Sequence, residues 1–260
     1  MLDVEDLVSG WRALGLLAGD AVIVHASLSA LGPVRGGAPT VVESLVRTVG
    51  VTGTVVAPTF TPQIADPDPD HVGVPSEEVR ARRGAVPLFE RTTPSRMGAI
   101  AEALRVRNDA VRSGHPQTSV AAVGRHAADI AAPGSLGFAL GKGSPFGRLH
   151  DLDGVILLVG VGHNRNSFLH HVETLTPRPR LKLRRFPLVV DGERVWCEVP
   201  DVGDDNDTHF PTVGRDFEEH AGVEAGFVGA AECRLLRVRP FVDFAVPRLT
   251  RLLDEARGCP

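Results

Sequence analysis

The residues with the most obvious chemical potential lie in the segment VGHNRNSFLHHVE, residues 161–173. It places His163, His170, His171 and Glu173 within eleven consecutive positions. Imidazole titrates near neutral pH and is also a common metal ligand, so the cluster could hold a metal ion or supply a catalytic base. A solvated polar helix face is the third interpretation. The spacing along the expected helix separates these alternatives.

A short helix is predicted to begin near Ser167, capped by that residue or by Asn166, because it follows an apolar strand-like run. On this helix His170 and Glu173 are three positions apart and share a face. His171 is turned away by about 100°. Helices that bind zinc usually place two histidines four apart. The pattern therefore favours a base beside a carboxylate, and no metal is expected.

The elements that must position this helix follow an alternating pattern of strands and helices. The expected strands are apolar on both faces, which is typical of strands buried between helical layers. Two further segments, 194–199 and 232–238, alternate as partly exposed or antiparallel strands do. One α/β domain over residues 1–260, with three α/β/α layers around a mixed, largely parallel sheet, is predicted. The main strands are expected at 21–27, 53–60, 119–124 and 154–162, and the helices at 4–17, 40–50, 97–107 and 246–257.

Ligands of open α/β sheets bind beyond the carboxyl ends of the strands, and the segment after 21–27 lies at such a place. It carries the glycine pair Gly36-Gly37, followed by a predicted capping box of Thr40 and Glu43 at a helix start. Paired glycines and a helix N-terminus suit an anion. A phosphorylated cofactor would fit here, and an ordinary Gly/Pro turn is the alternative.

Two other segments offer polar groups near strand ends. His115 and Pro116 precede the strand at 119–124, where proline would fix the backbone around the histidine. A structural and a functional role both remain open for His115. The run DVGDDNDTHF (201–210) is acidic, and so is PDPDHVGVPSEE (67–78), which is expected to be a surface loop. Such runs are either solvated loops or a pocket for a cationic ligand, and the calcium-loop pattern is not met.

Composition excludes several classes of protein. The net charge of −4 argues against nucleic acid as a partner. No apolar run is long enough to span a membrane, and the acidic N-terminus is not a signal peptide. The three cysteines are widely spaced without a CxxC pair, which fits a reducing cytoplasm and not a disulfide framework.

Taken in order, these segments are similar to a known family. HASLSALGPVRGGAPT, RSGHPQTSVAAVG, LGKGSPFGRLHDLDGVILLVGVGHNRNSFLHHVE and the acidic segment ending in HFPTVGRDFEE closely resemble the aminoglycoside N3-acetyltransferases, which are distinct from the GNAT fold. The resemblance covers nearly the whole chain. It implies an α/β/α fold, acetyl-CoA as donor, and the 3-amino group of the 2-deoxystreptamine ring of an aminoglycoside as acceptor, with antibiotic resistance as the result.

The resemblance also implies roles for individual residues. His170 of LHHVE takes the role of the base, with Glu173 beside it. A neighbouring carboxylate, from Glu173 or from the acidic run 204–207 before Phe210, would orient the imidazole. Asp205 is the expected catalytic residue of that run, and Asp204 is the alternative. The remaining expected contacts are Asp204, Asp207 and His115 for the acceptor, and His25, Ala26, Ser27, Leu28, Ser29, Gly36 and Ser144 for CoA.

The reacting ammonium must lose a proton before it attacks a thioester, so a positioned histidine suits this chemistry. No cysteine lies in any motif, which favours direct transfer over an acyl-enzyme. Three alternatives stay open: an acyltransferase acting on another amine in biosynthesis, a metal-dependent hydrolase using His163, His170 and Glu173, and a non-catalytic binder of cationic drugs. A monomer or a homodimer is expected.

Overall fold

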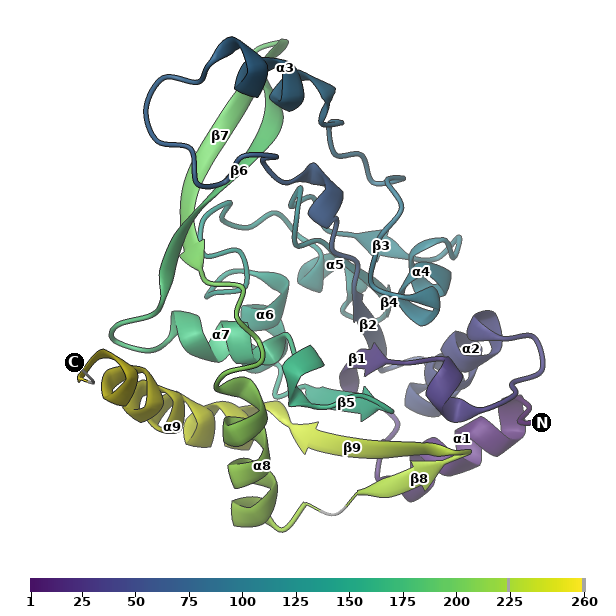
Figure 1. Ribbon diagram of the computed structural model, residues 1–260. Coiled ribbons are helices and arrows are strands. Elements are labelled where there is room, and N and C mark those ends of the chain that lie inside the picture. Colours follow the sequence, from purple (N-terminus) through teal and green to yellow (C-terminus); the bar gives the residue numbers. More distant parts are fainter. Residues whose placement is uncertain (224, 259–260) are drawn as a thin grey trace.

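The computed structural model describes residues 1–223 and 225–258 and is organised around a seven-stranded mixed sheet (Figure 1). Its three central strands are parallel, and the strands on both sides of them are antiparallel. The predicted mixed sheet is confirmed. In their order across the sheet the strands are β3 (Val111–Arg112), β4 (Val120–Gly124), β2 (Thr54–Pro58), β1 (Ala21–Ala26), β5 (Val155–Val159), β9 (Ala231–Arg237) and β8 (Gly226–Val228).

Helices cover both faces of this sheet, so the predicted three-layer architecture is also confirmed. Within the described chain, no helix combines the length and the apolar composition that crossing a membrane requires. One face is covered by α1 (Val4–Ala13), α2 (Ala38–Val49) and α4 (Ala99–Arg105). The other carries α5 (Ala127–Ile130), α6 (Pro145–Asp151), α7 (Phe168–Thr174), α8 (Phe210–Ala221) and α9 (Val238–Gly258).

The central strands are mostly apolar because both of their faces are buried; the exceptions are Thr54 of β2 and His25 of β1, which are both buried. In β1, Ile23 contributes to the core under α5–α9, whereas Val22 and Val24 contribute to the core under α1, α2 and α4. In β5, Ile156 and Leu157 divide between the two cores in the same way. Successive side chains of a strand point to opposite faces, so a strand between two helical layers has no polar side.

The start of α2 differs from the prediction. The helix begins at Ala38, after Gly37 with φ +64°, and Pro39 lies in its first turn. Thr40 is therefore already inside the helix, and its backbone N–H donates to the carbonyl of Gly37. The carboxylate of Glu43 pairs with arginine side chains. The predicted capping box is wrong because glycine and proline set the helix start two residues earlier.

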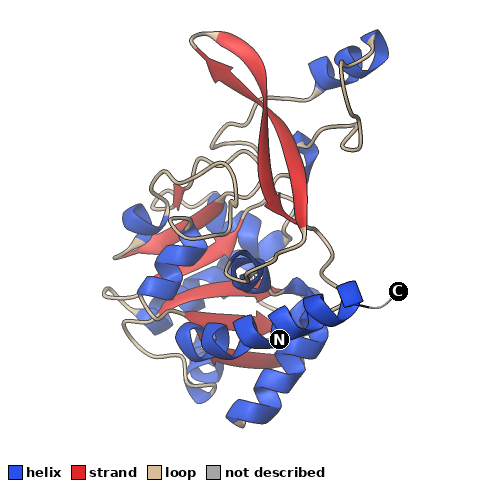
Figure 2. Cartoon of the chain, turned by 90° about the vertical axis from the view of Figure 1, so that its left-hand side faces the viewer, coloured by secondary structure: helices blue, strands red, loops and turns tan. Residues whose placement is uncertain are grey.

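A long hairpin rises from one end of the domain, as Figures 1 and 2 show. It consists of β6 (Leu181–Val190) and β7 (Glu193–Val202). Its buried Phe186 packs in a small separate core with Ile64 and Val86. These two residues belong to the segment that contains the 3-10 helix η2 (Pro62–Ile64) and α3 (Glu77–Ala85). The strand predicted at 194–199 belongs to this hairpin, whereas β6 was not predicted.

The topology gathers polar segments at one edge of the sheet. The carboxyl ends of the parallel strands β1, β2 and β5 meet there, and the antiparallel β4 starts at the same edge beside Pro58. His25 near the end of β1, the residues before β4, and α7 after β5 are therefore brought together. This is where an open α/β sheet places its ligands.

Candidate active site

His25 near the end of β1 is the residue that joins the sheet to α7. It is buried, and its Nε2 accepts a hydrogen bond of 3.1 Å from the backbone N–H of Ser167. Its Nδ1 has no hydrogen-bond partner in the described structure. Burial, and then repulsion from His163, lowers the pKa of His25 to about 3. His25 is therefore a neutral acceptor that fixes the start of α7.

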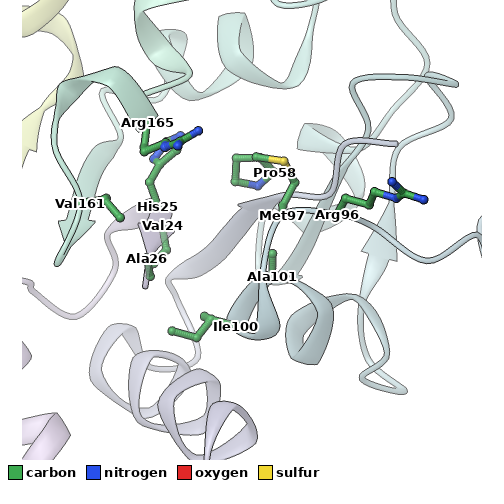
Figure 3. Close-up of a pocket in the computed structure, with 10 residues that line it drawn as sticks. All are labelled: Val24, His25, Ala26, Pro58, Arg96, Met97, Ile100, Ala101, Val161 and Arg165. Atoms are coloured by element: carbon green, nitrogen blue, oxygen red, sulfur yellow. The ribbon is translucent and has the colours of Figure 1, made fainter. Parts of the chain in front are cut away.

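A pocket of about 260 Å³, here called the strand-end pocket, opens beside His25 (Figure 3). Figure 3 shows His25, Ala26 and Val161 on one side and the α4 residues Ile100 and Ala101 on the other. The wall is mostly apolar, with two arginines at it. The full lining consists of Val24, His25, Ala26, Pro58, Arg96, Met97, Ile100, Ala101, Val161 and Arg165.

The next three predicted CoA contacts follow directly after this wall. The backbone N–H of Ser27 donates to the carbonyl of Val159, and the hydroxyls of Ser27 and Ser29 are 3.0 Å apart. Leu28 packs against the core below α1, α2 and α4. None of these three lines the strand-end pocket, whereas the predicted contacts His25 and Ala26 do.

His170 lies on α7 with 8% of its surface exposed. Its ring meets the ring of Phe210 edge-on, with 4.9 Å between the centroids. Its Nδ1 is buried and has no hydrogen-bond partner in the described structure. Burial lowers the pKa of His170, and the charge of Glu173 only partly opposes this effect. The imidazole is thus neutral near pH 7, as a base requires.

His170 lines a second, larger space of about 570 Å³, here called the hairpin cleft. The cleft lies between the segment after β2, the strand β6 and the loop after β7. It shares Met97 and Arg165 with the strand-end pocket, so the two spaces adjoin. Its lining consists of Phe60, Pro62, Ala65, Asp66, Pro69, Met97, Gln117, Thr118, Leu140, Arg165, Ser167, His170, Lys182, Leu183, Arg184, Arg185, Asp204 and Asn206.

Glu173 shares a helix face with His170 as predicted, but its carboxylate is occupied by Arg180. Glu173 is fully buried and accepts hydrogen bonds from the backbone N–H, Nε and Nη2 of Arg180, at 2.8–3.0 Å. No hydrogen bond joins Glu173 to His170 in the described structure. Arg180 also contacts Asp205 through Nη1 at 2.9 Å. Hydrogen bonds from Thr208 are the main cause that lowers the pKa of Asp205 to about 2.

The other two acidic residues of the loop over 203–209, called the acidic loop below, have different neighbours. Asp204 lines the hairpin cleft, and its carboxylate contacts the side chains of Lys182 and Arg184. Asp207 accepts a hydrogen bond of 3.0 Å from Nδ2 of Asn164, which brings the loop against the segment before α7. The carboxylates expected to attract a cationic acceptor are therefore already paired within the chain.

His115 lies outside both spaces. Its Nδ1 accepts from the backbone N–H groups of Gln117 and Thr118, and its Nε2 lies 3.0 Å from the carbonyl of Leu136. Burial lowers its pKa. With both ring nitrogens occupied, His115 shapes the turn that carries Gln117 and Thr118 into the hairpin cleft. These contacts favour a structural role for His115, and the predicted contact with the acceptor stays a prediction.

Two further predicted CoA contacts are also separate from the strand-end pocket. Ser144 is buried at the N-cap of α6, where its hydroxyl accepts from the backbone N–H groups of Phe146 and Gly147. It lines a cavity of about 220 Å³ together with His115. Gly36 lines a surface pocket of about 560 Å³ beside α2. A role in CoA binding stays a prediction for both.

The two remaining histidines of the 161–173 segment face other partners. Nε2 of His163 is 2.8 Å from Glu218. Nδ1 of His171 is 2.7 Å from the carbonyl of Leu140. Across residues 1–223 and 225–258, no three side chains of His, Cys, Asp or Glu are placed to share a metal ion. The absence of a bound metal stays a prediction.

Two site residues escaped the sequence analysis. Arg165 lines both the strand-end pocket and the hairpin cleft, and Arg180 holds Glu173 and Asp205. The only available signal for Arg180 was the basic run RPRLKLRR (178–185), which directly follows α7. That run has the alternation of a strand, and its members Arg180, Lys182 and Arg184 pair with Glu173, Asp205, Asp204 and Asp201.

Comparison with known proteins places the chain in a family. Residues 23–250 match the family described as aminoglycoside 3-N-acetyltransferase. Two curated relatives are each 34% identical to the chain. They are the aminoglycoside N(3')-acetyltransferase-like protein YokD of Bacillus subtilis (93% of this chain, 90% of the relative) and aminoglycoside N(3)-acetyltransferase VII of Streptomyces paromomycinus (95% and 91%).

Solved structures agree with this assignment. The binary complex of AAC-IIIb with CoASH has a TM-score of 0.87 at 28% identity, over 96% of this chain and 97% of that one. The sisomicin-bound AAC-VIa has a TM-score of 0.86 at 29% identity, over 96% and 98%. The fold, the order of the motifs and the match over most of the chain agree, and the protein belongs to the aminoglycoside 3-N-acetyltransferase family.

Proposed function

We propose that this enzyme transfers the acetyl group of acetyl-CoA directly to the 3-amino group of the 2-deoxystreptamine ring of aminoglycosides, with His170 as general base, and so gives antibiotic resistance. The observation that carries the proposal is the position of His170. Its neutral, buried ring faces the hairpin cleft, and that cleft adjoins the strand-end pocket through Met97 and Arg165.

The strand-end pocket is the site we assign to the donor. Its apolar walls suit the thioester arm of CoA, and its two arginines, Arg96 and Arg165, suit the phosphate oxygens. A structural neighbour was solved with CoASH, which supports CoA as the donor's carrier. The segment Ser27–Ser29 follows this wall in the chain and remains a proposed contact with CoA.

The hairpin cleft is the site we assign to the acceptor. With about 570 Å³ it has the size of a small-molecule site. It contains His170 and the carboxylate of Asp204, to which an acceptor ammonium can bind. A structural neighbour binds sisomicin, which supports an aminoglycoside as the acceptor.

The chemistry requires one proton transfer that the chain itself can provide. Acetyl-CoA supplies the acetyl thioester. The acceptor ammonium first gives one proton to solvent. As the bond between the resulting amine nitrogen and the acetyl carbon forms, neutral His170 accepts a second proton from that nitrogen. The proton then passes to the sulfur when the carbon–sulfur bond breaks, which returns His170 to its neutral state. No cysteine is among the described residues that line either space, so we propose direct transfer without an acyl-enzyme.

A cytoplasmic location completes the proposal. Cys197 and Cys233 are free thiols, as is usual in a reducing compartment. Whether the enzyme is a monomer or a homodimer stays a prediction.

The decisive experiment is turnover of acetyl-CoA with a panel of 2-deoxystreptamine aminoglycosides, with the acetylated nitrogen located by NMR. We expect acetylation of the 3-amino group. Intact-mass measurement of the enzyme after incubation with acetyl-CoA alone should show no added acetyl group. Acetylation at another nitrogen would overturn the regiochemistry, and an acetylated enzyme would overturn direct transfer. A panel without turnover would exclude aminoglycosides as acceptors.

A further inference from the structure

We propose that Arg180 is a positioning residue for acetyl transfer, which ties Glu173 of α7 and Asp205 of the acidic loop into one network and so holds the ring of His170 in place. The inference rests on the proposed role of His170 as base. It assigns Glu173 and Asp205 to this network, and not to direct contact with the imidazole.

The first support is the completeness of the ion pair between Arg180 and Glu173. Glu173 has no exposed surface, yet both of its carboxylate oxygens accept hydrogen bonds from Arg180. A buried charge without a partner is costly, so Arg180 is what allows a carboxylate on this face of α7. The backbone N–H of Arg180 takes part too, which fixes the chain between α7 and β6.

The same guanidinium reaches the acidic loop. Nη1 of Arg180 contacts the Asp205 carboxylate at 2.9 Å, and Nη2 donates to the Asp205 carbonyl at 3.1 Å. Asp205 in turn accepts from the backbone N–H groups of Asp207 and Thr208, just before α8. Arg180 thus connects α7, which carries His170, to the loop that carries the acidic residues.

Arg180 also acts on His170 through Phe210. Its guanidinium lies over the ring of Phe210, 5.8 Å from the centroid, and the same ring packs edge-on against His170. Nδ1 of His170 has no hydrogen-bond partner within the described residues, so packing sets the orientation of the imidazole. Moving Phe210 would therefore move the base.

Charge gives Arg180 a second effect on the base. The charged groups that face His170 are Glu173 on its own helix, Arg184 on β6, Asp201 on β7 and Asp204 in the acidic loop. Glu173 favours the imidazolium, and Arg180 neutralises Glu173. In Arg180→Gln the amide can still donate a hydrogen bond to the Glu173 carboxylate but carries no compensating charge. The ionised carboxylate would then stabilise protonated His170, and the base would be lost at a higher pH than in the wild type.

The test compares Arg180→Gln, Arg180→Lys and the matched control Arg178→Gln. Arg178 is an exposed arginine two residues away that pairs with Asp254. For Arg180→Gln we expect kcat to fall about ten- to a hundredfold, the size of effect that misplacing a catalytic group produces. The decrease of kcat at low pH, here called the acid limb of the pH profile, should begin at a higher pH than in the wild type. The KM for acetyl-CoA should stay within about twofold of the wild type.

Arg180→Lys keeps one cation beside Glu173, so it should fold normally and recover part of kcat with the acid limb near its wild-type position. Arg178→Gln should match the wild type. An unshifted acid limb in Arg180→Gln, or kcat within twofold of the wild type, overturns the proposal. If His170→Ala retains wild-type kcat, the proposed base itself is wrong. Because His170→Ala does not involve Arg180, this result distinguishes a wrong assignment of the base from a wrong assignment of Arg180.

Discussion

At the scale of single residues, the proposed mechanism requires His170 to be neutral when the acceptor amine is bound. Burial lowers its pKa below the usual value of 6.5, so the imidazole stays unprotonated at neutral pH. His170→Ala should lower kcat by about 10²–10⁴-fold, the usual contribution of a general base, and leave the KM for acetyl-CoA nearly unchanged.

The pH profile provides the matching measurement. The wild-type rate should fall as pH decreases through the lowered pKa of His170, and His170→Ala should lack this limb. His115→Ala is the appropriate comparison, because that ring is occupied by backbone groups outside the cleft. If His115→Ala lost most of its kcat and His170→Ala kept it, the base would be His115 and not His170.

Lys182 allows a prediction about the acceptor. Its ammonium contacts the Asp204 carboxylate inside the hairpin cleft, and an aminoglycoside ammonium would have to compete for that carboxylate. Lys182→Met should therefore lower the KM for aminoglycosides, and Asp204→Asn should raise it. Because both groups are partly exposed, the expected change is only about two- to fivefold.

Steady-state kinetics with two acceptors that differ in the number of ammonium groups measures this effect, and the more cationic acceptor should respond more. Lys142→Met is the control, since Lys142 is the only other lysine and does not line the cleft. An increase in acceptor KM for Lys182→Met would show that Lys182 contributes to binding and does not compete with the acceptor.

At the scale of elements, α4 forms one wall of the strand-end pocket. Ala101 is 6% exposed and lines this pocket of about 260 Å³. Ala101→Leu should occupy part of the space proposed for CoA and raise the KM for acetyl-CoA about ten- to a hundredfold. Ala99→Leu, on the exposed side of the same helix, should leave it unchanged. If Ala101→Leu raised only the acceptor KM, the donor would bind elsewhere.

The elements differ in how far the sequence predicts them. The strands β1, β2, β4 and β5 were predicted because burial on both faces leaves an apolar run that is hard to mistake. β6 was missed because its outward and cleft-facing positions carry Leu181, Lys182 and Arg184, and Pro187 interrupts the run. The start of α2 was placed two residues late because a capping-box pattern coincided with a helix that Gly37 and Pro39 begin.

In the candidate site, too, some features could be predicted from the sequence and others could not. Helical geometry correctly predicted that His170 and Glu173 share one face of α7. It could not predict that Arg180, beyond two prolines, would turn back and occupy the carboxylate. The partner of a buried charge is chosen by tertiary structure, and several cations in the same run were equally near in sequence. The turn that the ring of His115 completes could not be predicted for the same reason, and its contact with the acceptor stays a prediction.

At the scale of the whole molecule, buried histidines make the stability depend on pH. Burial, and then repulsion from His163, lowers the pKa of His25 to about 3, and burial lowers that of His171 to about 4, whereas both would titrate near 6.5 in the unfolded chain. Burial also lowers the pKa of His170. The unfolded state therefore binds more protons below about pH 6.5, and acidification favours unfolding. The stability from these histidines is complete above pH 6.5 and decreases towards pH 4.

A pKa difference of one unit corresponds to about 1.4 kcal/mol, so His25 and His171 together account for roughly 4 kcal/mol of stability lost between pH 6.5 and 5. For a chain of this size, that predicts a fall in Tm of roughly 10 °C over this interval. Calorimetry from pH 7.5 to 4.5 measures it. His171→Gln, whose amide can still donate to the Leu140 carbonyl, should flatten the slope, and His220→Gln, at an exposed position, should not. A constant Tm between pH 7 and 5 would mean that these rings take up protons in the folded protein as easily as in the unfolded chain. Burial would then not lower their pKa, and the argument that burial keeps His170 neutral would fail as well.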